Sequence, residues 1–263
     1  MNTAPHRDDY PQLREVTIVI LFTLIVTSSI GFLSAIFGQR KELFLLEGLI
    51  VLPATIFIIR NNYSIIRLFR LKWVNWRVVA ASLAIGLAFT IVSDEIDRIV
   101  QIFFPLPEPL AEAIQKSIQI NSLSDLIIIG FSAVFLAAFV EEMMFRGFVQ
   151  TGFENTFDIT KAVMATSLIF AVVHFNPWWS IQVLVFGIVL GVMSWKSDSI
   201  IPSAIVHFIN NGVALAFANM EKESYSWYLY KEHVSIPILI VAGLVTFYGF
   251  KLFYHYCELD EKV

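Results

Sequence analysis

The sequence has little charge and almost no cysteine. Of its 263 residues only 15% are charged and 57% are hydrophobic, whereas about a quarter of the residues of a soluble chain are charged. Its single cysteine, Cys257, excludes an internal disulfide and a zinc site built from cysteines. The net charge of −4 is small and spread along the chain, so no nucleic-acid-binding surface is indicated. This composition, with a mean hydropathy of +0.71, predicts a polytopic membrane protein.

Long apolar runs dominate the chain instead. A spanning helix needs about 20 mostly apolar residues. Eight segments approach that length: 16–37, 43–59, 77–93, 125–151, 160–175, 179–195, 200–219 and 235–256. The first is too long for the apolar part of a cleavable signal peptide, and no A-x-A site follows it. The predicted fold class is therefore all-α, a helix bundle with about eight transmembrane helices, in which residues 1–263 form a single integral-membrane domain.

The distribution of Lys and Arg predicts the orientation. The densest basic cluster follows the second predicted span and holds Arg60, Arg67, Arg70, Lys72 and Arg77. With eight spans, eleven Lys and Arg residues fall on that side and six on the other. Both termini are therefore predicted to be cytoplasmic, with the protein in the cell membrane and lipid as its surroundings.

Two stretches are expected not to span the membrane. Residues 94–124 begin with three acidic side chains, pass through three prolines and then read as a short amphipathic helix on the outer surface. Residues 221–232 are polar and rich in aromatics, as is typical of a membrane interface. Within the second predicted span, Glu47 is assigned a structural role near the membrane edge, with a functional role as the alternative.

The most informative stretch ends the apolar run 126–139 and contains Glu141, Glu142 and Arg146. Charges in an apolar helix are costly unless they are paired or functional. Glu142 and Arg146 are four residues apart, so they share a helix face and can pair. Glu141 is rotated about 100° from Glu142 and stays free to exchange a proton. In isolation, these three residues could equally be a buried structural cluster.

Three polar residues on later spans favour a functional site over a purely structural cluster. His174 ends the fifth predicted span, while His207 and Asn211 lie on one face of the seventh. Glu141 and His174 are nearly equidistant from a turn expected near residues 154–158, about 25 Å along their helices, and so lie at similar depth. We expect Glu141 and His174 to activate water, His207 and Asn211 to bind the oxyanion, and Glu142 and Arg146 to position Glu141.

Together these residues resemble the CPBP family of intramembrane proteases, which includes CAAX prenyl endopeptidases and bacteriocin-processing and abortive-infection relatives. The Glu-Glu-x-x-x-Arg motif matches Glu141, Glu142 and Arg146; the Phe-x-x-x-His motif matches Phe170 and His174; the His-x-x-x-Asn motif matches His207 and Asn211. The motif-bearing core covers about residues 125–215. The resemblance implies a glutamate-dependent endopeptidase that needs no metal or other cofactor and acts on a peptide or a membrane-associated protein. The resemblance does not imply that the substrate is prenylated, and it does not determine the oligomeric state.

Three alternatives remain. Two histidines and a glutamate could hold catalytic zinc, although the compact His-Glu-x-x-His helix is missing and asparagine is a poor zinc ligand. A serine or aspartyl intramembrane protease is disfavoured, because Gly-x-Ser-x-Gly and the Tyr-Asp with Gly-x-Gly-Asp pair are missing. A non-catalytic membrane protein, such as an immunity factor or scaffold, could keep the same residues. A transporter is disfavoured because no internal repeat is evident.

Overall fold

The computed structural model describes residues 10–37 and 41–260, and within them the protein is almost entirely helical. In chain order the helical elements are α1 (Leu13–Phe37), the 3₁₀ helix η2 (Lys41–Val51), α2 (Leu52–Arg60), α3 (Ile65–Leu68), α4 (Trp76–Phe103), α5 (Glu108–Ile118), α6 (Leu123–Ile129), the π-helix η3 (Gly130–Leu136), α7 (Ala137–Glu142), the π-helix η4 (Met143–Val149), α8 (Gln150–Glu154), α9 (Ile159–Val173), α10 (Ser180–Ser197), α11 (Ile201–Ala218), the 3₁₀ turn η5 (Lys222–Tyr225) and α12 (Ile236–Asp260). Two short strands, β1 (Leu229–Tyr230) and β2 (His233–Val234), pair antiparallel. The predicted all-α class is confirmed.

Six helices of the described chain are long and apolar enough to cross a membrane. They are Leu13–Leu33, Trp76–Phe103, Leu123–Glu154, Ser180–Ser197, Ile201–Ala218 and Ile236–Asp260. The other two predicted spans, 43–59 and 160–175, are helical but shorter. The first is divided into η2 and α2, and Pro53 lies in the first turn of α2, where its missing N–H costs no hydrogen bond.

Helix α9 is short for a spanning helix. It begins where Asp158 accepts a hydrogen bond from the backbone N–H of Lys161 at 3.1 Å, an N-cap. It ends at Val173, and Pro177 lacks the N–H that would otherwise bond to the Val173 carbonyl and continue the helix. Its 15 residues extend about 22 Å, less than the hydrocarbon thickness of about 30 Å. A helix of this length leaves its last turn, with His174, within the apolar zone.

Helix α4 is longer than predicted. The sequence-based span ended at residue 93 because acidic residues follow, but α4 continues to Phe103. The carboxylates do not end the helix because they find partners. Arg98 donates from Nε to Asp94 at 2.9 Å within the helix, and both oxygens of Glu95 accept hydrogen bonds from His233 and Val234 of β2 at 2.8 Å. The amphipathic helix predicted after it is α5.

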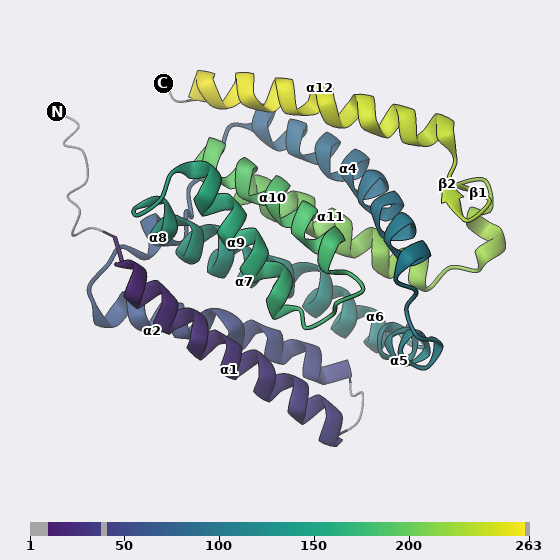
Figure 1. Ribbon diagram of the computed structural model, residues 1–263, viewed down its shortest axis with the longest axis horizontal. Helices are drawn as coiled ribbons and strands as arrows, with labels where there is room; N and C mark the ends of the chain where they lie inside the picture. The colour runs from purple at the N-terminus through teal and green to yellow at the C-terminus, as the bar shows by residue number, and fades with distance from the viewer. Residues whose placement is uncertain (1–9, 38–40, 261–263) are drawn as a thin grey trace.

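The helices form a bundle with two flanks (Figure 1). Helices α1 and α2 lie along one flank, α4 and α12 along the other, and α7, α9, α10 and α11 lie between them. The bundle has two clusters of buried apolar side chains. One joins α1, α2, η4 and α9, and the other joins α4, α10, α11 and α12. Phe170 belongs to the first and Phe186 to the second, so the polar side chains between them lie at the junction of the two cores.

The ends of the bundle differ. The first turn of α1 and the last turn of α12 lie at one end, with α8, while α5 and the β1–β2 hairpin lie at the other (Figure 1). The turn between α8 and α9 spans residues 155–158, where the sequence predicted it. The helices that carry the polar motifs therefore run between these two ends.

Candidate active site

The two glutamates lie on a six-residue α-helix between two π-helices. Helix α7 ends at Glu142, with η3 before it and η4 after it. A π-helical turn is wider than an α-helical one and is frequent at functional sites, because it changes the direction in which neighbouring side chains point. The sequence predicted one regular helix here, and the π-helical segments are a finding of the structure.

Glu142 and Arg146 form the predicted ion pair, and both side chains are completely buried. Arg146 Nη1 donates to Glu142 Oε1 at 3.0 Å, and Nη2 donates to the carbonyl oxygen of Gly187 at 3.4 Å. The guanidinium carbon also lies 4.0 Å from the centre of the Phe170 ring, a cation–π contact. Losing either charge would leave the other buried without its partner, which is strongly destabilising.

His207 of α11 contacts both glutamates. Its Nδ1 is 3.0 Å from Glu142 Oε1, and its Nε2 is 3.8 Å from Glu141 Oε2. The imidazole is held between the two apolar cores, with ring centres 6.0 Å from Phe170 and 5.4 Å from Phe186. The sequence identified His207 as a site residue but paired Glu142 with Arg146 alone, because residues 65 positions apart give no local signal of contact.

The two carboxylates differ in accessibility. The side chain of Glu142 is 0% exposed and that of Glu141 is 15% exposed. Glu47 of η2, which packs against α7, interacts electrostatically with Glu141. Two carboxylates from different helices therefore lie near the accessible part of the site. The sequence assigned Glu47 a structural role near the membrane edge, with a functional role as the alternative.

His174 lies just beyond the end of α9 and is held by its own helix. Its Nδ1 is 2.6 Å from the carbonyl oxygen of Phe170, and the two rings meet edge-on with centres 4.6 Å apart. A carbonyl oxygen only accepts, so Nδ1 must carry a proton and Nε2 of the neutral ring keeps its lone pair. Within the described chain, no hydrogen bond or ion pair joins His174 to either glutamate, and Phe170 is the side chain that links it to Arg146 and His207.

Asn211 lies one turn after His207 on α11. Its Nδ2 donates to the carbonyl oxygen of Ala133 in η3 at 2.9 Å. An amide nitrogen carries two protons, so one remains for another acceptor. The six predicted site residues thus fall into a contacting group of Glu141, Glu142, Arg146 and His207, with His174 and Asn211 beside it.

The arrangement of these side chains also bears on metal binding. In the described part of the chain, no three or more His, Cys, Asp or Glu side chains are arranged to hold a metal ion. Glu142 Oε1, the oxygen nearest His207, already accepts from a guanidinium. A cation at that oxygen would have to compete with the charge of Arg146.

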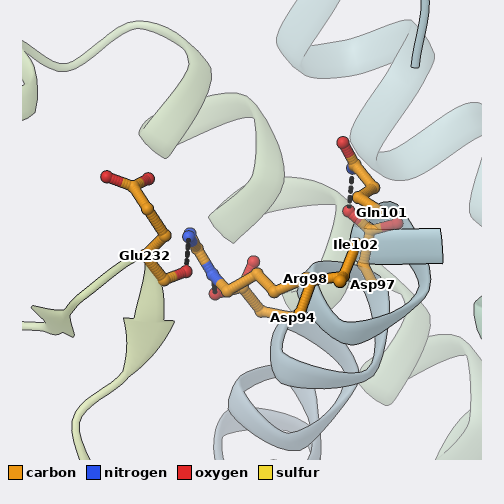
Figure 2. Close-up of a pocket in the computed structure, with 6 residues that line it drawn as sticks. All are labelled: Asp94, Asp97, Arg98, Gln101, Ile102 and Glu232. Carbon is orange, nitrogen blue, oxygen red and sulfur yellow. Dashed lines mark hydrogen bonds and ion pairs between the residues drawn. The ribbon is translucent and has the colours of Figure 1, made fainter. Parts of the chain in front are cut away.

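A second group of polar residues lines a pocket at the C-terminal end of α4 (Figure 2). Asp94, Asp97, Arg98, Gln101 and Glu232 line a pocket of about 320 Å³. Arg98 donates to Asp94 within α4 and to the carbonyl oxygen of Glu232 at 2.9 Å, and Tyr228 donates to Asp94 at 2.8 Å. Burial and the nearby carboxylate of Asp94 raise the pKa of Tyr228, which keeps its hydroxyl protonated as a donor. These bonds attach the β-hairpin to α4.

Comparison with known proteins identifies the motif-bearing part of the chain. Residues 123–213, roughly a third of the sequence, match the family model described as type II CAAX prenyl endopeptidase Rce1-like. Neither the curated proteins nor the solved structures contain a match. The matched segment runs from α6 into α11 and includes Glu141, Glu142, Arg146, His174, His207 and Asn211. The match supports a CAAX-protease-like intramembrane endopeptidase, because residues 123–213 are similar to that family's model.

Proposed function

We propose that the protein is an intramembrane endopeptidase in which Glu141 and His174 activate water and His207 and Asn211 bind the oxyanion. The observation that carries the proposal is the contact of His207 with two adjacent carboxylates, one of them buried against Arg146. Burying charged side chains inside an apolar bundle costs free energy, which favours a functional role for this cluster. Its substrate is a peptide or a membrane-associated protein.

Accessibility favours Glu141 over Glu142 as the general base. A general base must reach the water whose proton it removes. Glu141 is the carboxylate with exposed surface, whereas Glu142 is completely enclosed and already accepts from Arg146 and His207. Glu142 and Arg146 are therefore positioning residues, which hold His207 and the end of α7 in place.

The tautomer of His174 suits it to the same water. Because Nδ1 is engaged by the Phe170 carbonyl, Nε2 is the nitrogen that can accept a proton. In the reaction, one water proton passes to Glu141 or to His174 Nε2, and the hydroxide oxygen bonds to the peptide carbonyl carbon. That proton then passes to the departing nitrogen as the C–N bond breaks, which leaves a carboxylic acid and an amine, and the acid then gives its proton to the amine or to solvent.

His207 and Asn211 supply the hydrogen bonds to the oxyanion. His207 donates from Nδ1 to Glu142, so donation from Nε2 requires the doubly protonated ring, and the neighbouring carboxylates balance its charge. Asn211 gives one amide proton to Ala133 and keeps the second for the oxyanion. A preorganised donor of this kind contributes roughly 10²–10³-fold to the rate of acyl transfer.

The experiment compares protein N-termini in membranes of cells that express the wild type or Glu141→Gln at equal levels. The amide keeps the size of the side chain but cannot remove a proton. We expect a set of new N-termini with the wild type that disappears with Glu141→Gln. Glu112→Gln, on an exposed part of α5, is the matched control and should retain them all.

Identical N-termini with both proteins, when Glu141→Gln is folded and keeps any cellular phenotype, would favour a non-catalytic immunity or scaffold role.

The zinc alternative needs a separate measurement. If the reaction is metal-independent, purified enzyme retains its activity after incubation with a chelator and contains less than stoichiometric metal. Loss of activity that is restored by added Zn²⁺ would support the zinc enzyme.

A further inference from the structure

The residue that follows His174 has an unusual backbone conformation. Phe175 has a φ of 50°, in the left-handed region that residues other than glycine, asparagine and aspartate rarely occupy. A helix commonly ends in this conformation, and the residue there is usually glycine, because glycine has no Cβ to clash with the backbone. Here the chain places a bulky aromatic residue where glycine is favoured.

The other non-glycine residues with positive φ in the described chain have local explanations. Asn62 is of a type that tolerates this region, and Lys231 and Glu232 form the two-residue turn of the β-hairpin. Arg70 is buried with its guanidinium bonded to Glu154 and to the Arg146 carbonyl, which offsets the cost of its backbone, and Asp198 is of a type that tolerates this region. Phe175 has none of these supports.

Burial does not explain Phe175 either. Its side chain is 64% exposed, so the unfavourable backbone is not offset by packing within this chain. The surrounding turn is well defined, because the Trp178 N–H donates to Asn176 Oδ1 at 3.1 Å and Ser180 Oγ donates to the Asn176 carbonyl at 2.9 Å. The side chain of Phe175 therefore extends outward from a hydrogen-bonded turn immediately beside His174.

We propose that Phe175 is a specificity-determining residue, which contacts an apolar side chain of the substrate next to the scissile bond while His174 acts on the water. The inference rests on the proposed function. Strained residues that persist without an internal benefit occur at ligand-contacting sites. The covalent link to His174 puts the Phe175 Cα one residue from the reacting groups, within reach of substrate residues that flank the cleaved bond.

The main competing explanation is that Phe175 only contacts lipid. In that case its replacement would change membrane packing but not the choice of substrate. The two explanations differ in one measurable quantity, the preference among peptides that differ in a single residue beside the scissile bond.

The test uses the purified full chain and four variants: Phe175→Gly, Phe175→Leu, Asn62→Gly as a control for relief of backbone strain, and Phe32→Ala as a control for an exposed phenylalanine on α1. The probe is an internally quenched decapeptide that spans the strongest Glu141-dependent cleavage site found in membranes. A second peptide carries alanine in place of its largest apolar residue beside the scissile bond. Thermal unfolding in detergent micelles is measured in parallel.

We expect Phe175→Gly to raise the unfolding temperature by about 2–4 °C, while KM for the first peptide rises roughly tenfold, as for loss of an aromatic anchor. The preference for the first peptide over the alanine peptide should fall as well. Phe175→Leu should keep part of that preference, and both controls should keep all of it.

Unchanged KM and preference in Phe175→Gly would overturn the proposal in favour of lipid contact alone. A lower unfolding temperature would overturn the strain argument on which it rests. If the wild type itself produces no Glu141-dependent N-termini, the proposed function fails and the role of Phe175 fails with it. Cleavage by the wild type with no effect at Phe175 overturns only the role of Phe175.

Discussion

At the scale of single residues, the energetics of the site are dominated by charges without access to water. Glu142 and Arg146 are fully enclosed, and Glu142 Oε2 and Arg146 Nε have no hydrogen-bond partner among the described residues. Their mutual attraction, together with the contacts to His207, Gly187 and Phe170, must therefore offset their desolvation. The same enclosure restricts the movement of both side chains, as their proposed role of holding His207 and the end of α7 in place requires.

Arg146→Met should destabilise the protein strongly, because it leaves the Glu142 carboxylate buried with no cation except a protonated His207. We expect a loss of about 3–5 kcal/mol in the free energy of unfolding. The double variant Arg146→Met with Glu142→Leu removes both charges and should recover most of that loss without recovering peptidase activity. Thermal unfolding in micelles and cleavage of the quenched peptide measure the two effects. A single variant as stable as the wild type would contradict the argument.

Residue spacing predicted the local part of the site but not its long-range part. The Glu142–Arg146 pair follows from the geometry of one helix turn, which any helix imposes. The contact between His207 and Glu142 depends on how α11 is rotated against α7, and a single sequence holds no information on that rotation. The side chain of Asn211 was assigned to the oxyanion alone, whereas one of its protons is given to Ala133.

At the scale of elements, the N-terminal third of the chain, which carries no motif, holds the motif helix in place. Phe69 and Arg70 follow α3 and pack directly on η4. Arg70 is 4% exposed and donates from Nη1 to the carbonyl oxygen of Arg146 at 3.2 Å, and it also pairs with Glu154. The segment can approach this closely because Gly147 has no side chain.

Gly147→Ala should therefore disturb the site. A Cβ at this position would lie 2.7 Å from the Cα of Phe69, and a backbone atom cannot move aside as a flexible side chain can. We expect a loss of about 1–3 kcal/mol in stability, together with reduced peptidase activity, because the displaced segment carries Arg70 away from Arg146. Thermal unfolding and peptide cleavage are the measurements.

Gly130→Ala is the matched control, because a Cβ there would have no atom within 4 Å. Its backbone is helical, so alanine should leave stability unchanged or raise it slightly. Equal effects of the two substitutions would show that helix propensity, and not the contact with Phe69, decides the outcome.

Apolar length predicted the elements well but misjudged their ends. Helix α4 passes through Asp94, Glu95 and Asp97, because partners from the hairpin and from α4 itself stabilise two of these carboxylates and Gln101 donates to the third at 2.7 Å. Such partners are tertiary and cannot be read from hydropathy. The π-helical turns around α7 were missed for a similar reason, since they depend on packing against η2, α10 and α11.

At the scale of the whole molecule, the bundle has two distinct ends, and charge predicts which of them faces the cytoplasm. Trp73 lies in the segment that joins α3 to α4 and is 92% exposed, near the basic cluster of residues 60–77. Helix α5 lies at the opposite end, with the hairpin (Figure 1). The single native cysteine, Cys257, is buried in the core cluster of α4 and α12, so introduced cysteines can be labelled against a low background.

In a Cys257→Ala background, Trp73→Cys and Glu112→Cys should react oppositely with a membrane-impermeant maleimide. On intact cells, Glu112→Cys should be labelled and Trp73→Cys should not, because positively charged loops stay cytoplasmic. Both should be labelled after the membrane is permeabilised, which controls for accessibility of the two positions. The reverse pattern on intact cells would place the basic cluster outside. His174 follows the short helix α9, which starts at the basic end of the bundle, so the reverse pattern would also place the start of α9 on the outer side.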